Sequence, residues 1–454
     1  MGSISPTDLL GLAAAGVVVC WFTLLVNRIA GSKRESVLVP LLLVIWIAAD
    51  AVTESIEPSI IISTFRISAF DVISVALIVI GVARLVSLDI GGPGRGLVAL
   101  LLAFFTVHVV RGILDFGVKS AINDARPWFY FFAALVFAAT IPMRQSRRIW
   151  IVIISSGVLL TVIAVPYLLI DGIHPATELV RRNGTLTTNR PIISTGALVI
   201  LQSAILAVGL EWPSRKGAVR IAIGAGTVVL LLEHRTLWVA GLAVGAVAFF
   251  WWFRGRTEVG SSSAFGVTGL ALLLLPVAVW GFTQSQALSS SASETTSSNS
   301  TFTWRTTSWE ELISSHHSTS QLLFGQPSGA SVARVIDGSL VMRSPHDGFV
   351  DAYLRFGGFG LAVLCALGIL LWRHRAIIAA GSGLTVQAVS LVLLTQFIYC
   401  ITYDLDLVQG LIDGLFISGL VAASTARAPV ASSTRSLIGR KSSTLGFRQR
   451  LVER

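Results

Sequence analysis

Charged residues are scarce in this chain. Lys, Arg, Asp and Glu together make up 13% of its 454 residues, roughly half the share found in soluble domains. Hydrophobic residues make up 54%, and apolar runs near the ~20 residues needed to span a bilayer recur along most of the length. This composition excludes an ordinary soluble domain. It predicts an all-α, polytopic integral membrane protein with about 12–13 transmembrane helices.

Cysteine is also scarce. Cys20, Cys365 and Cys400 all lie in apolar runs and lack the spacing of metal ligands, so we predict that they are small buried hydrophobes. His316 and His317 lie in a polar stretch without a matching cluster of ligands. We therefore predict no metal site and no bound cofactor.

A basic segment is missing before the first apolar run, and further apolar runs follow it, so we predict a retained first helix rather than a cleaved signal peptide. The membrane domain should cover residues 1–425, and the Ser- and Arg-rich tail at 426–454 should be disordered. The predicted spans are residues 9–27, 37–52, 68–87, 97–114, 127–143, 149–170, 191–210, 217–232, 236–253, 264–283, 348–372, 377–401 and 407–424.

Acidic residues are rare in every second connecting segment. With the N-terminus outside, most of the 34 Lys and Arg residues fall in cytosolic segments, and most of the 24 Asp and Glu residues fall in external ones. The net charge of +10 thus reflects topology and attraction to anionic lipid, and nucleic acid is not an expected partner. We predict a multi-pass protein of the inner or plasma membrane with a cytosolic C-terminus.

Polar groups at mid-membrane depth, which a transporter needs, are lacking as well. The ionisable groups gather instead at the external ends of the predicted spans. One large external loop, at about 284–347, begins with a flexible Ser- and Thr-rich run and continues with spaced Trp and Leu residues. We expect short amphipathic helices over the membrane face there, and a loop of this length favours a functional role.

Three external clusters need an explanation: "RRNGTLTTNRPI" at 181–192, "LLLEHRTLWVAGL" at 230–242 and "SPHDGFVDAYLRFGGFG" at 344–360. Arginines flank an Asn-Gly turn in the first cluster, and charged residues interrupt an apolar stretch in the second. Guanidinium groups bind phosphate in a bidentate manner and keep their charge. Arginines at one membrane face therefore indicate a pyrophosphate site.

The third cluster contains a helix-start pattern, Ser344-x-x-Asp347, with Pro345 at the first helical position. This pattern predicts a helix that begins there, with His346 in its first turn. The helix dipole would then favour a neutral imidazole, which can accept a proton from a hydroxyl group. The alternative is a histidine that only caps or fills space.

Two further groups have structural explanations. Asp351 and Arg355 are spaced to meet on one helix face, and we predict that they form a supporting ion pair. Arg126 precedes Pro127 at a helix-start position, and snorkelling towards water would by itself explain it.

These clusters, together with "TWRTTSWEELI" and "LLFGQPSGA" between them, resemble the O-antigen ligase and O-antigen polymerase (Wzy-like) family of membrane glycosyltransferases. The resemblance covers most of the chain from about Asp71 onward. It implies a GT-C-like helical fold. It also implies a glycan donor linked to polyprenyl pyrophosphate, a glycan or lipid-glycan acceptor on the external or periplasmic face, and no metal. We expect the transfer to invert the anomeric configuration.

The resemblance also implies roles for individual residues. His346 matches the histidine that acts on the acceptor, and Arg235 matches a catalytic arginine. The remaining candidates are Arg190, Arg182, Arg305 and Arg126 for the pyrophosphate, and Trp304 and Trp309 for the glycan. Asp347 departs from the family, in which asparagine is common at this position.

Two other classes of function stay open. A flippase or transporter of lipid-linked glycans would move its substrate without covalent transfer, and a non-catalytic scaffold of a glycan assembly complex would not need the arginines and the histidine. Within the enzyme class, a ligase and a polymerase share the same chemistry and differ in the acceptor. The sequence does not separate them, and it does not predict the sugar, the linkage, the carrier length or the oligomeric state.

Overall fold

The computed structural model describes residues 59–62, 65–87, 93–141, 143–170, 179–182, 185–188, 192–254, 269, 301–314, 318–330, 332–336, 339–341, 345 and 347–427. The predicted spans at 9–27 and 37–52, nearly all of the span at 264–283, and nearly all of the tail lie outside these residues, as does His346.

The described part is predominantly helical, as predicted. Its helices are α3 (Ala69–Ser87), α4 (Pro93–Phe116), α5 (Val118–Ala139), α6 (Met143–Ile170), α7 (Ser194–Leu210), α8 (Arg215–Leu231), α9 (Arg235–Phe253), α12 (Thr301–Ser314), α13 (Thr319–Phe324), α14 (Gly348–Arg373), α15 (Arg375–Ser382), α16 (Val386–Cys400) and α17 (Leu407–Arg427).

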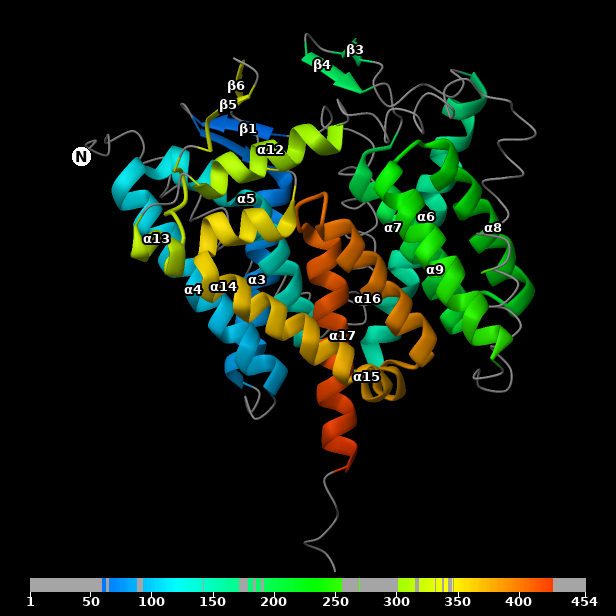
Figure 1. Cartoon of the computed structure of the whole chain (residues 1–454). Helices are drawn as coiled ribbons and strands as arrows, with labels where there is room; N and C mark the ends of the chain where they lie inside the picture. Colours follow the sequence, from blue (N-terminus) through cyan, green and yellow to red (C-terminus); the bar gives the residue numbers. More distant parts are fainter. Residues whose placement is uncertain are drawn as a thin grey trace, which may run out of the picture.

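Short antiparallel hairpins accompany the helices and were not predicted. They are β1 (Ser59–Ile62) with β2 (Phe65–Ser68), β3 (Leu179–Arg182) with β4 (Thr185–Thr188), and β5 (Arg334–Ile336) with β6 (Ser339–Val341). Such strands contain too few residues for an alternating pattern to stand out in a sequence. The hairpins and α12 lie at one end of the helices, and the C-terminal end of α17 lies at the opposite end (Figure 1).

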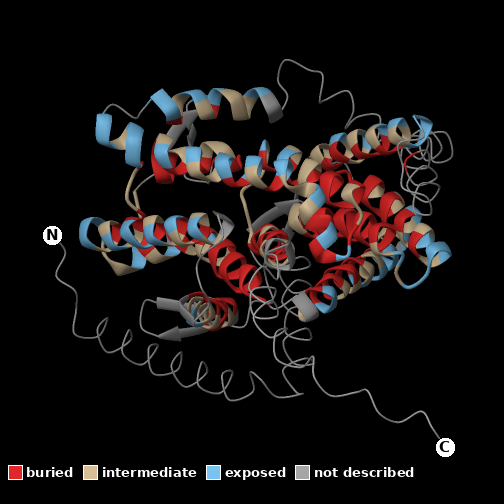
Figure 2. Ribbon diagram, turned by 90° about the horizontal axis from the view of Figure 1, so that it is seen from below, coloured by how far each residue is buried: buried red, intermediate tan, exposed pale blue. Residues whose placement is uncertain are grey.

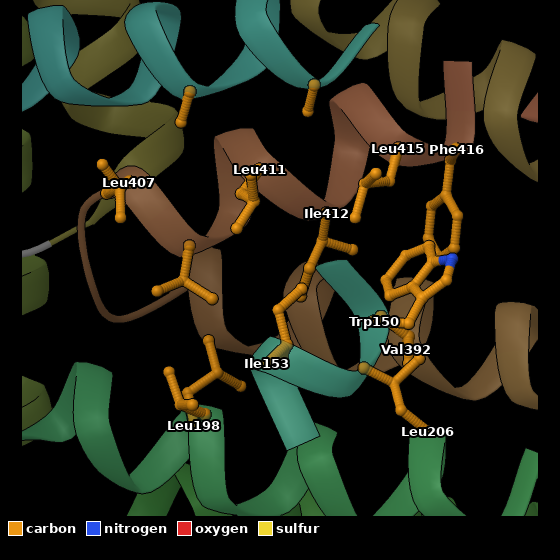
Figure 3. Close-up of a cluster of buried hydrophobic side chains, with 14 of the residues drawn as sticks. Trp150, Ile153, Leu198, Leu206, Val392, Leu407, Leu411, Ile412, Leu415 and Phe416 are labelled. Carbon is orange, nitrogen blue, oxygen red and sulfur yellow. The ribbon is translucent and has the colours of Figure 1, made fainter. Parts of the chain in front are cut away.

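Helix α17 runs through the middle of the molecule against α5, and α3 and α4 pack on α5 (Figure 1). On the other side, α7 packs against α6, α8 and α16. Figure 2 shows buried residues on the inward faces of the helices and exposed residues on the outer faces. In the centre, Trp150 of α6 lies against Phe416 of α17, with 5.5 Å between ring centroids (Figure 3). This apolar core holds the helix ends that carry the candidate site.

The described ranges contain four helices long and apolar enough to cross a membrane: Arg95–Phe116, Gln145–Leu169, Arg235–Phe253 and Gly348–Arg373. The pair α15 and α16 adds a fifth if it counts as one span. The multi-pass membrane protein that the composition predicts is therefore confirmed in outline. The total of about 12–13 spans stays a prediction for the whole chain.

The two cysteines in the described part of the chain differ, and Cys20 lies outside it. Cys400 at the end of α16 is buried, as predicted, whereas Cys365 on α14 is exposed. The prediction was wrong for Cys365 because this side chain faces an open cavity between α14 and α16, rather than the packed core.

The span predicted at 377–401 is not one straight helix, because α15 and α16 meet at an angle of 117°. Gly383 has a φ of +73° and ends α15 in the left-handed conformation, which glycine adopts without strain. Thr385 then caps α16, since its side chain accepts the N–H of Ala388. The bend arises because Gly383 ends α15 and Thr385, two residues later, caps the start of α16.

Helix α14 is also broken. Gly357 has φ +65° and ψ −172°, so the helical segment 348–356 is followed by a kink and then by the segment 358–373. A Cβ atom on Gly357 would overlap the backbone carbonyl group of Leu323 in α13. The first segment lies below α12, and the second runs towards α15 (Figure 1). The glycine thus permits the backbone of α13 to approach the kink.

The contact between α5 and α17 leads to a stability prediction. A Cβ atom on Gly410 would overlap the carbonyl oxygen of Phe131, which is backbone and cannot move aside. Gly410→Ala should therefore destabilise the protein by about 3 kcal/mol through overpacking. In Gly241→Ala the added methyl group meets nothing within 4 Å, so this control should gain about 0.5–1 kcal/mol of helix stability. Thermal unfolding in detergent measures both changes, and equal effects would contradict the packing argument.

Candidate functional site

Arg305 on α12 reaches the connection between α16 and α17. Its Nη1 donates to the carbonyl oxygen of Thr402 over 3.1 Å, and its guanidinium carbon lies 5.4 Å from the centre of the Tyr403 ring. The second contact has the geometry of a cation–π interaction. A residue of the predicted external loop is thereby fixed to the end of the helical core.

The same connection contacts α9. The Thr402 hydroxyl donates to the hydroxyl of Thr236 over 2.8 Å, and Thr236 directly follows Arg235, the first residue of α9. Thr402 therefore links Arg305 to the start of α9. We call Arg235, Thr236, Arg305, Thr402 and Tyr403 the Thr402 cluster. It contains two of the predicted site arginines, which are far apart in the sequence.

The segment around His346 lies beside the Thr402 cluster. Trp309, one turn after Arg305 on α12, donates its indole N–H to the carbonyl oxygen of Pro345 over 2.8 Å. A Cβ atom on Gly348 would lie 3.1 Å from the carbonyl oxygen of Tyr403. His346 itself lies outside the described residues, but residues on both sides of it approach α12 or the cluster.

The predicted glycan-binding tryptophans both belong to α12. Trp304 is half-buried, and so is Trp309, whose indole N–H is already used by Pro345. The bond to Pro345 gives Trp309 a positioning role beside His346. With its N–H engaged in this way, Trp309 would contact a sugar through its ring.

The start of α14 differs from the prediction. The helix begins at Gly348 with Asp347 as its N-cap, and the Asp347 carboxylate accepts the N–H of Val350 over 2.7 Å. Aspartate is among the best capping residues. His346 therefore precedes the cap and is not in the first turn. The dipole argument for a neutral imidazole consequently loses its basis, since that effect is confined to the first turn.

His234, directly before α9, is hydrogen-bonded to Ile192, which lies just before α7. Nε2 of His234 donates to the carbonyl oxygen of Ile192 over 3.0 Å. Glu233, which precedes this histidine, has a φ of +55° in the left-handed region. Strain of this kind in a residue other than glycine often occurs at functional sites.

For the arginines of the first cluster, the described contacts show no link to the Thr402 cluster. Arg190 lies outside the described residues. Arg182 lies opposite Thr185 in the backbone register of β3 and β4. Both remain candidates from the sequence alone.

Arg126 has a different neighbour. Its Nη2 lies 3.0 Å from Oδ2 of Asp71 in the first turn of α3, and the Tyr130 hydroxyl donates to Oδ1 of the same carboxylate over 2.9 Å. Ser68 also donates its N–H to Asp71. These contacts join Arg126 to α3 rather than to the Thr402 cluster, so its role in pyrophosphate binding has no support from the described contacts.

Arg355 lies between two carboxylates. Its Nε is 3.6 Å from Oδ1 of Asp351, the predicted partner, and its Nη1 is 2.5 Å from Oδ2 of Asp124 on α5. Trp128 donates to Asp351 over 2.6 Å, and the N–H of Gly329 donates to Asp124 over 2.7 Å. This network therefore fixes the chain that follows α13 against α5 and α14.

The Thr402 cluster suits an anion. It brings Arg305 close to the N-terminus of α9, where Arg235 is the first residue and where the N–H groups and the dipole favour negative charge. Within the described ranges, no group of three or more His, Cys, Asp or Glu side chains could hold a metal ion.

No protein-family model and no curated protein matches this chain. The chemistry of the site residues is therefore the basis for a function.

The residues that connect the parts of the site were not predicted. Thr402 and Thr236 carry no charge, and nothing in their local sequence distinguishes them from other threonines at helix ends. Asp124 was also missed, although its burial beside an arginine is typical of a structural ion pair. Its position in the sequence could have indicated it, because Asp124 lies only two positions before Arg126 at a predicted external helix end.

Asp347 leads to a pH prediction. Burial raises the pKa of its carboxyl to about 6, although the N–H of Val350 and the charge of Arg305 act in the opposite direction. Ionisation of this carboxyl costs more in the folded state than in the unfolded state. The resulting loss of folding stability is absent below pH ~4, grows between pH ~4 and 6, and is complete above pH ~6. Asparagine caps a helix equally well and does not ionise.

Asp347→Asn should accordingly stabilise the protein by about 1–2 kcal/mol at pH 7.5, after allowance for solvent screening, and have little effect at pH 4. Melting temperatures of both proteins across this pH range measure the difference. A difference that stays constant with pH would show that Asp347 does not titrate as its burial requires.

Proposed function

We propose that this protein is a membrane glycosyltransferase of GT-C-like fold that transfers a glycan from a polyprenyl pyrophosphate carrier to an acceptor hydroxyl. The reaction would take place on the external face of the cell membrane, below a large external loop that contains α12 and α13. The proposal covers both a polymerase and a ligase of cell-envelope glycan.

One observation carries the proposal. Arg305 and the start of α9, which bears Arg235, are linked through Thr402, and Trp309 binds the residue directly before His346. Arg305, the start of α9 and the residue before His346 are thus connected although they come from separate parts of the chain. That combination could supply an anion site for a leaving pyrophosphate and a base for an attacking hydroxyl.

The proposed reaction is a single displacement. The acceptor oxygen attacks the anomeric carbon and forms the new glycosidic bond while the bond from that carbon to the pyrophosphate oxygen breaks. The pyrophosphate leaves with the electron pair, and Arg235 and Arg305 stabilise its growing charge, with Arg190 and Arg182 as further candidates. His346 accepts the proton of the hydroxyl. Attack opposite the leaving group inverts the anomeric configuration.

Reconstitution tests the proposal. The purified protein is placed in vesicles with a polyprenyl-pyrophosphate-linked glycan and an acceptor, and the products are sized on a gel. A ladder of products identifies a polymerase, and a single conjugate identifies a ligase. The same assay is run with His346→Ala and Arg235→Ala.

Covalent product from the natural chain, and its loss in both variants with unchanged melting temperatures, is the expected result. Movement of the intact donor across the vesicle without a new glycosidic bond would identify a flippase instead. Normal turnover by the folded His346→Ala protein would remove His346 from the mechanism.

A further inference from the structure

A cavity of about 680 Å³ lies between α14, α16 and α17. It extends along α14 from Gly348 at the start of the helix to Arg373 at its end. Its walls are mostly leucine, phenylalanine and other apolar side chains. Cavities of this size with apolar walls and few polar groups are typical of sites for small ligands.

Gln396 of α16 and Asp413 of α17 bring polar groups into this cavity. Gln396 is only 6% exposed. Its Nε2 and the Oδ1 of Asp413 have no hydrogen-bond partner among the described residues. A buried polar atom without a partner is costly, and an unpaired ionisable group inside a membrane protein is by default a functional site. Asp413 was not among the predicted site residues, and it lies within the span predicted at 407–424.

The two groups define the chemistry of an occupant. Nε2 of Gln396 is a donor and needs an acceptor, whereas Oδ1 of Asp413 is an acceptor and needs a donor. A hydroxyl group supplies both. A phosphate does not fit beside a carboxylate, and Arg373, the basic residue of the lining, belongs to the last turn of α14 at the far end from Gly348.

The rest of the lining defines the other part of the ligand. From Leu361 to Trp372, the second segment of α14 contributes mainly apolar side chains to the cavity wall, and Leu393 and Phe397 of α16 contribute to it as well. An extended hydrocarbon chain would cover these side chains, and its hydroxyl end would satisfy the polar pair.

We propose that this cavity binds a long-chain lipid alcohol, whose hydroxyl group donates to Asp413 and accepts from Gln396. The cavity shares no lining residue with the Thr402 cluster, although Gly348 at one end of it lies beside Tyr403, and the proposal does not depend on glycan transfer. It adds an uncharged lipid to the ligands of the protein.

Photo-crosslinking of the full chain in detergent tests the proposal. The probe is a photoreactive long-chain primary alcohol, and labelled peptides are identified by mass spectrometry. Competitors are the unlabelled alcohol, the alkane of the same length and the matching carboxylic acid. We expect label in α14 and α16, and competition by the alcohol about tenfold stronger than by the alkane or the acid.

A space-filling variant distinguishes the cavity from the outer surface. A Cβ atom on Gly368, which lines the cavity, meets nothing within 4 Å. Gly368→Phe should therefore fold normally, fill the space and abolish the label. Gly241 has the same open surroundings but does not line the cavity, so Gly241→Phe is the matched control and should keep the label.

The polar pair is tested by Asp413→Leu and Gln396→Leu, each checked by its melting temperature. Both should remove the preference for alcohol over alkane and keep binding of the chain. Equal competition by alkane and alcohol in the natural protein would mean that the cavity holds ordinary bilayer chains, and the proposal would fail. Undiminished labelling of Gly368→Phe would overturn it as well.

Discussion

Replacing Arg305 by methionine should lower the rate of the proposed glycan transfer by about 10²–10³-fold, the usual effect of removing one group that stabilises a developing negative charge. Methionine keeps most of the length of the side chain but loses the charge. It also loses the hydrogen bond to Thr402 and the contact with Tyr403. The rate of covalent transfer in vesicles measures the effect.

Two variants separate the role of charge from that of folding. Arg305→Lys keeps the charge but not the planar guanidinium, so it should recover part of the rate. Arg254 also lies over an aromatic ring, 4.2 Å from the centre of Phe250, but at the other end of α9. Arg254→Met should therefore leave the rate unchanged. If Arg305→Met transferred glycan at the natural rate, Arg305 would have no part in pyrophosphate binding.

Arg355→Met should destabilise the protein by about 3–5 kcal/mol, because it leaves buried carboxylates without their cation. The side chain of Arg355 is 7% exposed, and those of its partners Asp124 and Asp351 are 19% and 8% exposed. Water therefore screens these charges poorly. Thermal unfolding in detergent at neutral pH measures the loss.

The double variant Arg355→Met with Asp124→Asn serves as the decisive comparison. It removes one of the two uncompensated charges, so it should be more stable than Arg355→Met alone even though it carries one more substitution. A double variant that is less stable than the single one would show that packing of the long side chain, rather than charge, dominates this site.

The helical fold was predictable because long apolar runs specify helices regardless of their neighbours. The predicted spans at 97–114 and 236–253 lie within α4 and α9, for instance. The kink at Gly357 was not predictable, since Gly357, Gly358 and Gly360 are equally plausible positions for a kink. Only the approach of Leu323 from another part of the chain distinguishes the first of them.

The candidate site was predictable only in its charged residues. Arg235 and Arg305 were selected because arginines at a predicted external face need an explanation. Their link through Thr402 is a tertiary contact that no local pattern encodes. The start of α14 was misplaced for a related reason: Ser344 and Asp347 both fit a cap, and the sequence alone does not rank them.

The kink in α14 has a consequence for protein engineering. The part before Gly357 follows the Asp347 cap and carries the ion pair of Asp351 and Arg355, whereas the part after it forms most of the apolar cavity wall on this helix. Because the helix axis is interrupted at Gly357, a change in the orientation of one part need not rotate the other. Gly357 is therefore a natural junction for chimaeras that exchange the cavity-lining half of this helix while the half beside the site stays intact.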